Sequence, residues 1–475
     1  MEPTDQAPLK WGEARELNAL ETLMWRVEND PRFRSPMVLV EVLDQVPDWD
    51  RFVASAEWGT RMAPRFRQRL IEPALGLGQP VWVTDPAFDL DYHVRRAALP
   101  SGGGIPSLIR AVEQLGMTPF DRARAPWEAV LFEGLPGGKA AFVLKMHHVA
   151  TDGLGGVQLL GQLHSRQRES DPRKPQPPAP PPERFSNRAM LREQFERDLM
   201  AVPRIARDGL TALTRRPRRA FLQRAVAYGA SLRRMLADPV VEGSPLLASR
   251  SLSFRYCALD VRFADLKAAG KAAGGSINDA YIAALLGGVR RYHEAKGQPV
   301  AAIPMAMPIS VRRPDDPEGG NRFVGIRFAG PLSIEDPRER IVAVRGQVKR
   351  LRSEPAVDAL VVLAPALSRL PGAILPVIAG GFTAQNDLQA SNVPGIREPR
   401  YIAGALIERT YGFGPLPGCA AMVSLITHLD RCCVGANVDP AAITDVPLFQ
   451  ECLVQGFDEV LALAGDGVEP TVAWA

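Results

Sequence analysis

The sequence predicts an α/β or α+β fold with two lobes, and three observations support this prediction. Segments with strand-like and helix-like patterns alternate in both halves of the chain. A proline-rich stretch over residues 171–184 separates the halves as a stiff connector. The length of 475 residues is more than one core usually fills. We therefore expect a first lobe over residues 1–170 and a second lobe over residues 185–475.

The first half alternates between strands and helices. Residues 37–43 are rich in Val and predict a strand, and the apolar periodicity of residues 105–115 predicts a helix. Residues 127–135 and 139–148 predict two strands joined by a Pro-Gly-Gly turn. A helix is expected over residues 153–162.

The second half repeats the alternation. The predicted elements are a strand over 251–259, a helix over 276–294, a strand over 303–311, a helix over 338–352, one or two strands over 420–438 and a terminal helix over 448–464. The helix over residues 276–294 has a defined start, because Ser276 can cap it and Asp279 follows three residues later, close to a capping box.

Residues 188–236 predict helices that are unusually rich in Arg. Two interpretations stay open for this segment. It is either a solvated pair of surface helices or a segment that docks on an anionic membrane or a lipid droplet.

Composition and charge restrict the class of protein. Hydrophobic residues make up 46% and charged residues 23% of the chain, as in ordinary globular proteins. The net charge is +4, but no motif that reads DNA or RNA accompanies it, which argues against a nucleic-acid partner. A mildly basic chain suits an anionic ligand or an anionic lipid surface.

The cysteines and the apolar segments indicate a compartment. The five Cys are irregularly spaced without a CxxC pair, which argues against a disulfide framework and against a zinc site. The N-terminus shows no signal-peptide pattern. The most apolar region, residues 356–382, is interrupted by Pro and charged residues, so a buried helix pair or a lipid-tail lining suits it better than a membrane span. We expect a cytoplasmic protein.

One short motif carries the chemistry. It is His147-His148-Val149-Ala150-Thr151-Asp152-Gly153, an HHxxxDG run directly after a predicted strand. A His at a strand end can act as a general base near neutral pH, and the Gly permits a tight turn. The run suggests acyl transfer to an alcohol or amine without a metal or a covalent enzyme intermediate. The alternatives to a catalytic role are structural: a packed core His beside a surface His, and an ordinary Asp-Gly turn.

Several further blocks complete a pattern that resembles the bacterial wax ester synthase/acyl-CoA:diacylglycerol acyltransferase family nearly end to end. The matching blocks are residues 17–25 leading to Ser35-Pro36-Met37, residues 88–94, Pro126-Trp127-Glu128 before residues 132–135, Ser276-Ile277-Asn278-Asp279, residues 307–312 followed by Gly320-Asn321, and Ser391-Asn392-Val393-Pro394-Gly395. The family usually has Pro-Leu-Trp where this chain has Ala125-Pro126-Trp127. HHxxxDG alone is shared with other acyltransferases and with condensation domains, and the Asn-Asp and Asn-Val-Pro-Gly blocks narrow the resemblance.

The resemblance implies two coenzyme-A-dependent-acyltransferase-like lobes with mixed sheets, a central tunnel, and the His motif where the lobes meet. It implies an O-acyltransferase that moves a long fatty acyl chain from acyl-CoA to diacylglycerol, to a long-chain alcohol, or to both. Acyl-CoA is then a substrate, and neither a metal nor a permanently bound cofactor is expected. A lipid alcohol is the other expected partner, with contact at the inner membrane face or at lipid droplets. Monomer and homodimer both stay open.

The resemblance also suggests roles for single residues. His148 is expected to be the general base, while His147 packs inward at the strand end, with a supporting role left open. Asp152 either pairs with Arg312 or caps the helix that starts at Gly153. Asn278 either donates to the oxyanion or belongs to ordinary helix-start chemistry. Asn392, Pro394 and Gly395 are expected to shape a turn near the tunnel.

Two rival functions remain at this point. The first is another HHxxxDG acyltransferase that uses a carrier-protein thioester in place of acyl-CoA. The second is a non-catalytic lipid-binding protein that keeps the fold. The blocks around Asn278 and Asn392 disfavour the first rival, and the intact His148 and Asp152 disfavour the second.

Overall fold

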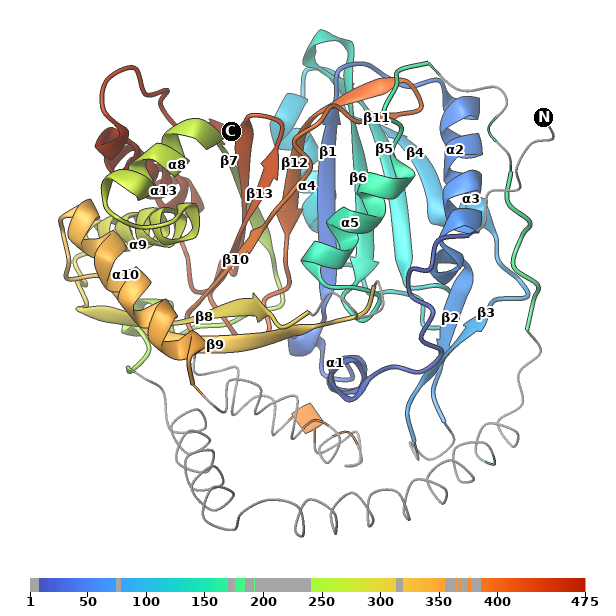
Figure 1. Ribbon diagram of the computed structural model, residues 1–475, viewed down its shortest axis with the longest axis horizontal. Helices are drawn as coiled ribbons and strands as arrows, with labels where there is room; N and C mark the ends of the chain where they lie inside the picture. Colours follow the sequence, from blue (N-terminus) through green and yellow to red (C-terminus); the bar gives the residue numbers. More distant parts are fainter. Residues whose placement is uncertain are drawn as a thin grey trace, which may run out of the picture.

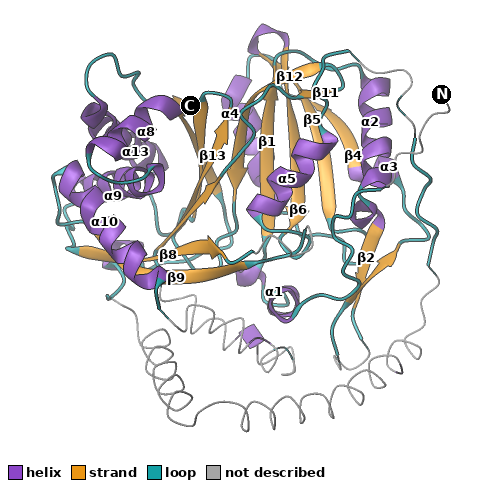
Figure 2. Cartoon of the chain, viewed as in Figure 1, coloured by secondary structure: helices purple, strands orange, loops and turns teal. Residues whose placement is uncertain are grey.

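The computed structural model describes residues 8–73, 78–169, 174, 176–183, 192, 241–312, 319–354, 364, 368, 375–376 and 386–474. These residues form two lobes that lie side by side, each built around one large sheet (Figures 1 and 2). The Arg-rich segment 188–236, apart from residue 192, lies outside the described residues. So does the apolar region 356–382, apart from residues 364, 368, 375 and 376.

The first lobe contains a six-stranded mixed sheet. Its strands, in spatial order, are β11 (Tyr401–Ile402), β12 (Ala405–Phe413), β1 (Pro36–Leu43), β6 (Lys139–His147), β5 (Trp127–Leu135) and β4 (Val94–Ala98). Only β4 and β5 pair in parallel; the other neighbours are antiparallel. The strands predicted around the His motif are confirmed, and the motif follows β6, the strand between β1 and β5.

The second lobe contains a seven-stranded mixed sheet. Its strands, in spatial order, are β15 (Val472–Trp474), β7 (Arg255–Arg262), β14 (Arg431–Val438), β13 (Ala421–His428), β10 (Leu388–Val393), β8 (Ala302–Ser310) and β9 (Phe323–Pro331). Strand β10 is parallel to both of its neighbours, and the remaining pairs are antiparallel. A two-stranded ribbon of β2 (Gln68–Ile71) and β3 (Val81–Thr84) stands apart.

Helices cover these sheets. In the first half they are α1 (Ala19–Val27), α2 (Trp49–Met62), α3 (Leu90–His93), α4 (Gly104–Met117) and α5 (Gly153–Leu163). In the second half they are α8 (Phe263–Ala272), α9 (Ile277–Ala295), α10 (Pro337–Arg352) and α13 (Val446–Leu461). None of these helices is both long enough and apolar enough to cross a bilayer.

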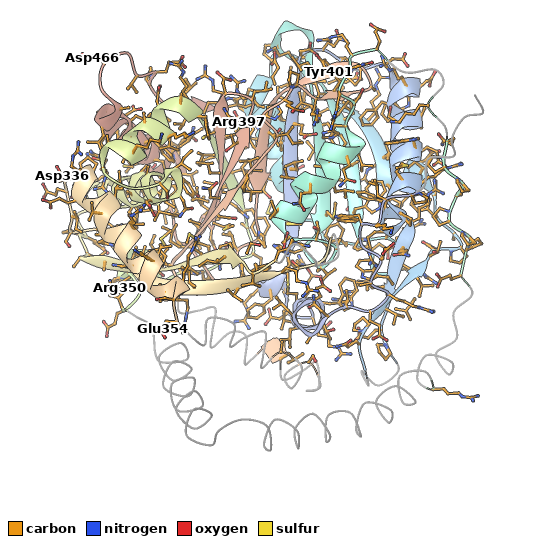
Figure 3. All side chains as sticks on the ribbon, in the orientation of Figure 1. Asp336, Arg350, Glu354, Arg397, Tyr401 and Asp466 are labelled. Carbon is orange, nitrogen blue, oxygen red and sulfur yellow. The ribbon has the colours of Figure 1, made fainter. Side chains whose placement is uncertain are left out.

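The helix ends follow local chemistry. Ser276 and Asp279 form the capping box that the sequence predicts for α9. Helix α10 begins after Asp336, whose side chain caps it, and ends on a basic turn that includes Arg350, so both ends complement the helix dipole (Figure 3). Helices α9 and α13 approach until a β-carbon on Gly456 would lie 2.3 Å from the backbone nitrogen of Gly288, so glycine is required at this crossing.

The two halves of the chain are interleaved. The proline-rich stretch falls between α5 and β7, yet β11 and β12 of the second half return to complete the first sheet beside β1. An apolar cluster then joins the lobes: Val38, Val40 and Tyr256 belong to it, and the ring of Tyr256 stacks 4.1 Å from that of Phe413. The two-lobed fold with mixed sheets is therefore confirmed, and one apolar cluster extends across both lobes in addition to the core of each.

A buried carboxyl lies on the other face of β1, away from the apolar cluster that joins the lobes. Glu41 is 3% exposed, and its Oε2 lies 3.4 Å from Nε2 of His164, which follows α5. Burial raises the pKa of Glu41 to about 8. Burial, with the charges of His428 and Arg400, lowers the pKa of His164 to about 3. Both groups are therefore neutral at pH 7, and their contact is not an ion pair.

We predict that Glu41→Gln flattens the pH dependence of stability above pH 6.5. Between pH 6.5 and 8 the unfolded chain has an ionised Glu41 while the folded chain keeps it protonated, so the free energy of unfolding falls as the pH rises. In this window His164 is neutral in the folded chain and loses its remaining proton in the unfolded chain, a contribution that the wild type and the variant share. From pH 6.5 to pH 8 the free energy of unfolding of the wild type should fall by roughly 2 kcal/mol more than that of Glu41→Gln, because each pH unit contributes about 1.4 kcal/mol. Denaturant unfolding at several pH values measures this difference.

The control for this prediction is Glu133→Gln, which removes a carboxylate that pairs with Arg96 on the same sheet. It should keep the wild-type slope. Equal slopes for the wild type and Glu41→Gln would contradict a protonated Glu41 in the folded protein.

Candidate active site

The His pair stands at the seam between the lobes. His147 is the last residue of β6, and the backbone N–H of His148 donates to the carbonyl of Ser35 at 2.9 Å, which continues the pairing with β1. Thr151 then forms a parallel bridge with Gly320 of the second half. The ring of His148 also lies 5.7 Å from that of Phe323, the first residue of β9. The motif thus contacts both lobes.

His147 is fully buried and both of its ring nitrogens are used. Its Nδ1 accepts the backbone N–H of Val149 at 3.1 Å, and its Nε2 donates to Glu28 Oε2 at 2.9 Å. Burial alone would raise the pKa of Glu28, but His147, Ser35 N–H and Arg122 outweigh burial and hold this pKa below its usual value. His147 therefore packs inward and ties the end of β6 to the segment after α1.

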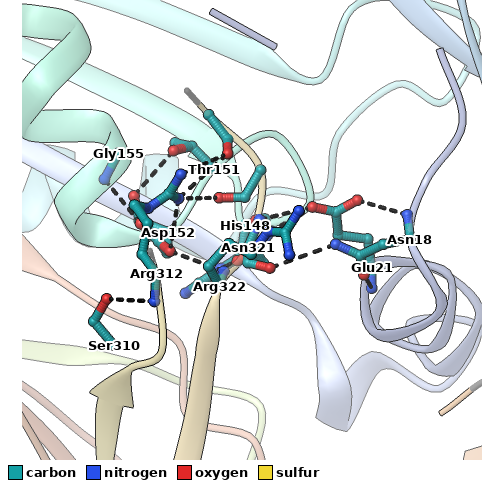
Figure 4. Close-up of polar contacts among 12 residues, drawn as sticks. Asn18, Glu21, His148, Thr151, Asp152, Gly155, Ser310, Arg312, Asn321 and Arg322 are labelled. Atoms are coloured by element: carbon teal, nitrogen blue, oxygen red, sulfur yellow. Dashed lines mark hydrogen bonds and ion pairs between the residues drawn. The ribbon is translucent and has the colours of Figure 1, made fainter. Parts of the chain in front are cut away.

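His148 is only partly buried and has one occupied nitrogen. Its Nδ1 contacts Asn321 Oδ1 at 2.9 Å, whereas its Nε2 has no hydrogen-bond partner among the described residues (Figure 4). Burial lowers the pKa of His148, although the charge of Asp152 and the contact with Asn321 act in the opposite direction. The ring is therefore neutral at pH 7, and its free nitrogen is the one farther from the backbone.

Asp152 makes both contacts that the sequence left as alternatives. Its Oδ1 accepts the backbone N–H of Gly155 at 2.8 Å and so caps α5. Its Oδ2 accepts from Arg312 Nη2 at 3.3 Å and from the backbone N–H of Arg322 at 3.1 Å (Figure 4). The side chain is 10% exposed. One carboxylate thus starts a helix of the first lobe and holds the loop between β8 and β9 of the second.

Arg312 belongs to this loop and binds its other end. Its guanidinium donates to the carbonyl oxygens of Gly319 and Gly320, at 3.2 Å and 3.1 Å, in addition to Asp152. Gly320 has a φ of +67°. A left-handed backbone favours glycine, which explains the Gly before Asn321.

Two glycines of the motif region lie close to neighbouring side chains. A β-carbon on Gly155 would lie 2.3 Å from Thr151 Oγ1, so a larger residue here would displace the Thr151 hydroxyl. A β-carbon on Gly153 would lie 3.0 Å from a methyl group of Val393 on β10. The HHxxxDG motif and the Asn-Val-Pro-Gly block are therefore neighbours in space.

The Asn-Asp block is also brought to β10. Asn278 lies in the first turn of α9, and its Oδ1 accepts from Asn392 Nδ2 at 3.4 Å. Its Nδ2 points to Met307 Sδ at 3.8 Å, a weak contact that leaves the second N–H of this amide without a partner among the described residues. Because Asn392 takes the oxygen of Asn278, the available end of Asn278 is a hydrogen-bond donor.

Pro394 is exposed just after β10, and Gly395 follows it. A β-carbon on Gly395 would lie 1.9 Å from the carbonyl oxygen of Thr427, so only glycine fits. Both residues lie in the irregular segment that follows β10. Trp127 packs in the core and donates to the carbonyl of Phe66 at 2.7 Å.

Four residues of this site carry no signal in the sequence that would assign them a role. Glu28 and Ser35 support His147 and His148, and Glu21 and Asn321 contact each other beside His148. Asn321 belongs to a matching block, but neither spacing nor periodicity relates it to a His 173 residues earlier.

In the described part of the chain no cluster of His, Cys, Asp and Glu is suited to a metal. An apolar pocket between α2, α5 and the first sheet is not lined by any HHxxxDG residue.

Comparisons with known proteins identify the family. Residues 14–281 match the model of the wax ester synthase/diacylglycerol acyltransferase catalytic domain, and residues 319–460 match that of the family's C-terminal domain. A Mycobacterium tuberculosis protein, provisionally named a diacylglycerol O-acyltransferase, is 42% identical over 463 residues, which cover 96% of this chain and 94% of the relative.

Solved structures share the fold. The wax ester synthase/diacylglycerol acyltransferase from Marinobacter aquaeolei VT8 has a TM-score of 0.62 at 21% identity and covers 95% of this chain and 100% of its own. A mutant starter condensation domain of rhizomide synthetase, in complex with C8-CoA and Leu-SNAC, has a TM-score of 0.57 at 14% identity, with 96% and 95% covered. Two family models, a full-length relative and the shared fold show that this chain is an acyltransferase that belongs to the wax ester synthase/diacylglycerol acyltransferase family.

Proposed function

We propose that the protein transfers a long fatty acyl chain from acyl-CoA to the hydroxyl group of diacylglycerol, a long-chain alcohol, or both, with His148 as the general base. The observation that carries this proposal is the neutral imidazole of His148, which keeps one nitrogen free at the seam of the lobes. A base of this kind must bear a lone pair and lie within reach of the proton that it removes.

The reaction follows from this nitrogen. Nε2 of His148 removes the proton of the acceptor hydroxyl while the hydroxyl oxygen attacks the thioester carbonyl carbon. The tetrahedral oxyanion then collapses, the carbon–sulfur bond breaks, and the leaving thiolate takes the proton back from Nε2. The products are an ester and free coenzyme A, so no nucleophile of the protein is acylated.

Asn278 is our candidate for stabilising the oxyanion. Its free amide N–H is a donor, and it lies in the first turn of α9, where the helix dipole also favours negative charge. The contacts from Asn278 to Asn392, and from Val393 to Gly153, support its placement near the His motif. The motif residues Asn392, Pro394 and Gly395 then serve to position β10 and the turn after it.

The substrates are proposed from the comparisons. The name of the Mycobacterium tuberculosis relative refers to diacylglycerol, and the family's name adds wax esters. A structural neighbour was solved with C8-CoA, which supports an acyl-CoA donor. Such acceptors are held in membranes and lipid droplets, so the proposal includes access of the enzyme to a lipid surface. Condensation domains share the fold, which keeps a carrier-protein thioester as the second donor to be tested.

The first prediction of this proposal concerns His148→Gln. We expect release of free thiol from palmitoyl-CoA to depend on added dioleoylglycerol or hexadecanol, and to fall by about 10²–10⁴-fold in the variant, the usual value of base catalysis. His293→Gln is the control, because His293 is a buried His of the other lobe, bonded to Ser244. Normal turnover by His148→Gln would remove His148 as the base. If turnover is seen only with the acyl chain carried as a thioester on an acyl carrier protein, that thioester is the donor in place of acyl-CoA.

The second prediction concerns Asn278→Ala. Because an oxyanion donor acts in the transition state, kcat should fall by about 10²-fold or more while KM for palmitoyl-CoA stays nearly unchanged. Steady-state kinetics on folded protein measure this. Asp336→Ala is the control, since Asp336 likewise stands at a helix start, where its side chain caps α10. A rise in KM at constant kcat would assign Asn278 to binding.

The third prediction separates the two roles of Asp152. Asp152→Ser keeps a capping oxygen for Gly155 but loses the contacts to Arg312 and Arg322, whereas Asp152→Ala loses all three. We expect both variants to lose turnover and the Ala variant to be less stable than the Ser variant by about 1 kcal/mol, the usual value of an N-cap. Denaturant unfolding measures the difference. Equal stabilities would show that the cap contributes nothing.

A further inference from the structure

We propose that Asn321 is a positioning residue that holds His148 in the tautomer with the proton on Nδ1 and the lone pair on Nε2, and that Glu21 fixes Asn321 for this role. The inference rests on the proposed function, in which His148 is the base. Asn321 then determines which nitrogen of His148 is basic, although Asn321 has no contact with substrate in our mechanism.

The orientation of the Asn321 amide is determined by its neighbours. Its Nδ2 lies 2.8 Å from the carbonyl oxygen of His148 and 3.4 Å from Glu21 Oε1 (Figure 4). Both of these atoms are acceptors, so the NH₂ group must face them. Rotating the amide by half a turn would place its oxygen against two other oxygens. The oxygen Oδ1 therefore faces the ring of His148.

This orientation selects the tautomer. Oδ1 of Asn321 can only accept, so Nδ1 of His148, at 2.9 Å, must carry the proton. Nε2 then has the lone pair. The carbonyl oxygen of His148 itself also raises the pKa of the ring. Asn321 Nδ2 donates a hydrogen bond to that same oxygen. Asn321 thus contacts the base at its ring and at its backbone.

Glu21 holds Asn321 from the first lobe. Its Oε1 accepts the backbone N–H of Asn321 at 2.7 Å, and its Oε2 accepts the backbone N–H of Asn18 at 2.8 Å, which completes the capping box of α1. Glu21 and Asn321 are 5% and 3% exposed. A β-carbon on Gly320 would lie 3.1 Å from Glu21 Oε1, so the glycine leaves room for this contact. The start of α1 and the loop before β9 are therefore joined through Glu21.

A neutral amide suits the task better than a carboxylate would. A carboxylate at this position would stabilise the imidazolium and raise the pKa of His148. Among the charged groups that act on the ring, Asp152 raises this pKa and His147 lowers it, while burial lowers it most. Asn321 fixes the tautomer by an uncharged hydrogen bond, and the base stays neutral.

The test is nitrogen-15 NMR of the histidine side chains in the full-length protein. Two-bond nitrogen–proton correlations distinguish the two tautomers, and the His148 signal is identified by its absence in His148→Gln. The variants are Asn321→Leu, which removes the amide at similar volume, and Asn437→Leu as the matched control. Asn437 is 1% exposed in β14 and donates to Gly414 at 2.8 Å.

In the wild type we expect His148 to have its proton on Nδ1 and to titrate below pH 6.5. Asn321→Leu should shift the signal toward the Nε2–H tautomer, which a free histidine prefers, and lower its pKa further because an acceptor of the Nδ1 proton is lost. Its kcat should fall by roughly 10- to 100-fold, less than the whole of base catalysis, with KM little changed. Asn437→Leu should behave as the wild type.

Two results would overturn the inference: an Nε2–H tautomer in the wild type, or an unchanged tautomer and kcat in folded Asn321→Leu. If Asn321→Leu does not fold, the wild-type tautomer still decides. Failure of the proposed function is seen separately, because His148→Gln would then keep its turnover whatever the NMR signals show.

Discussion

The contact that the rest of the site depends on is the pairing of the loop after β6 with the loop before β9. Asp152 provides its centre, with one oxygen on the first turn of α5 and the other on Arg312 and the backbone of Arg322. The bridge from Thr151 to Gly320 aligns the two loops. Because this carboxylate is nearly buried and all its partners are donors, removing it leaves several donors unsatisfied. The position of His148 relative to the second lobe depends on this contact.

The adjacent histidines differ because both ring nitrogens of His147 are bound, whereas only one ring nitrogen of His148 is bound. His147 presents Nδ1 to a backbone N–H and Nε2 to Glu28, so it has no nitrogen left for chemistry. His148 is bound at Nδ1 only and keeps Nε2 free. Successive residues of a strand point to opposite faces, so a pair of histidines at a strand end naturally divides into a buried anchor and a residue at the seam. The depressed pKa of His148 comes mainly from burial and keeps the ring neutral.

Much of the fold could be predicted from local patterns, but the pairing of the strands could not. The strands over residues 37–43, 127–135 and 139–148 and the capped helix α9 follow from alternation and capping chemistry, and they are confirmed. The terminal helix is confirmed too, yet the chain continues to β15 at the edge of the second sheet. The return of β11 and β12 to β1 is not visible in the sequence, since nothing in a short apolar strand states which sheet it will join.

The sequence by itself determined the chemistry: an HHxxxDG motif after a strand, a capped Asn-Asp helix start and an Asn-Val-Pro-Gly block. It left Asp152 with two alternatives because a capping contact is local and an ion pair with Arg312 is not; the folded chain makes both. Only the tertiary structure decided which histidine has a free nitrogen, because the acceptor on Nδ1 of His148 is Asn321, 173 residues away. The tautomer of an imidazole is set by whatever lies beside the ring, and here that neighbour comes from the other lobe.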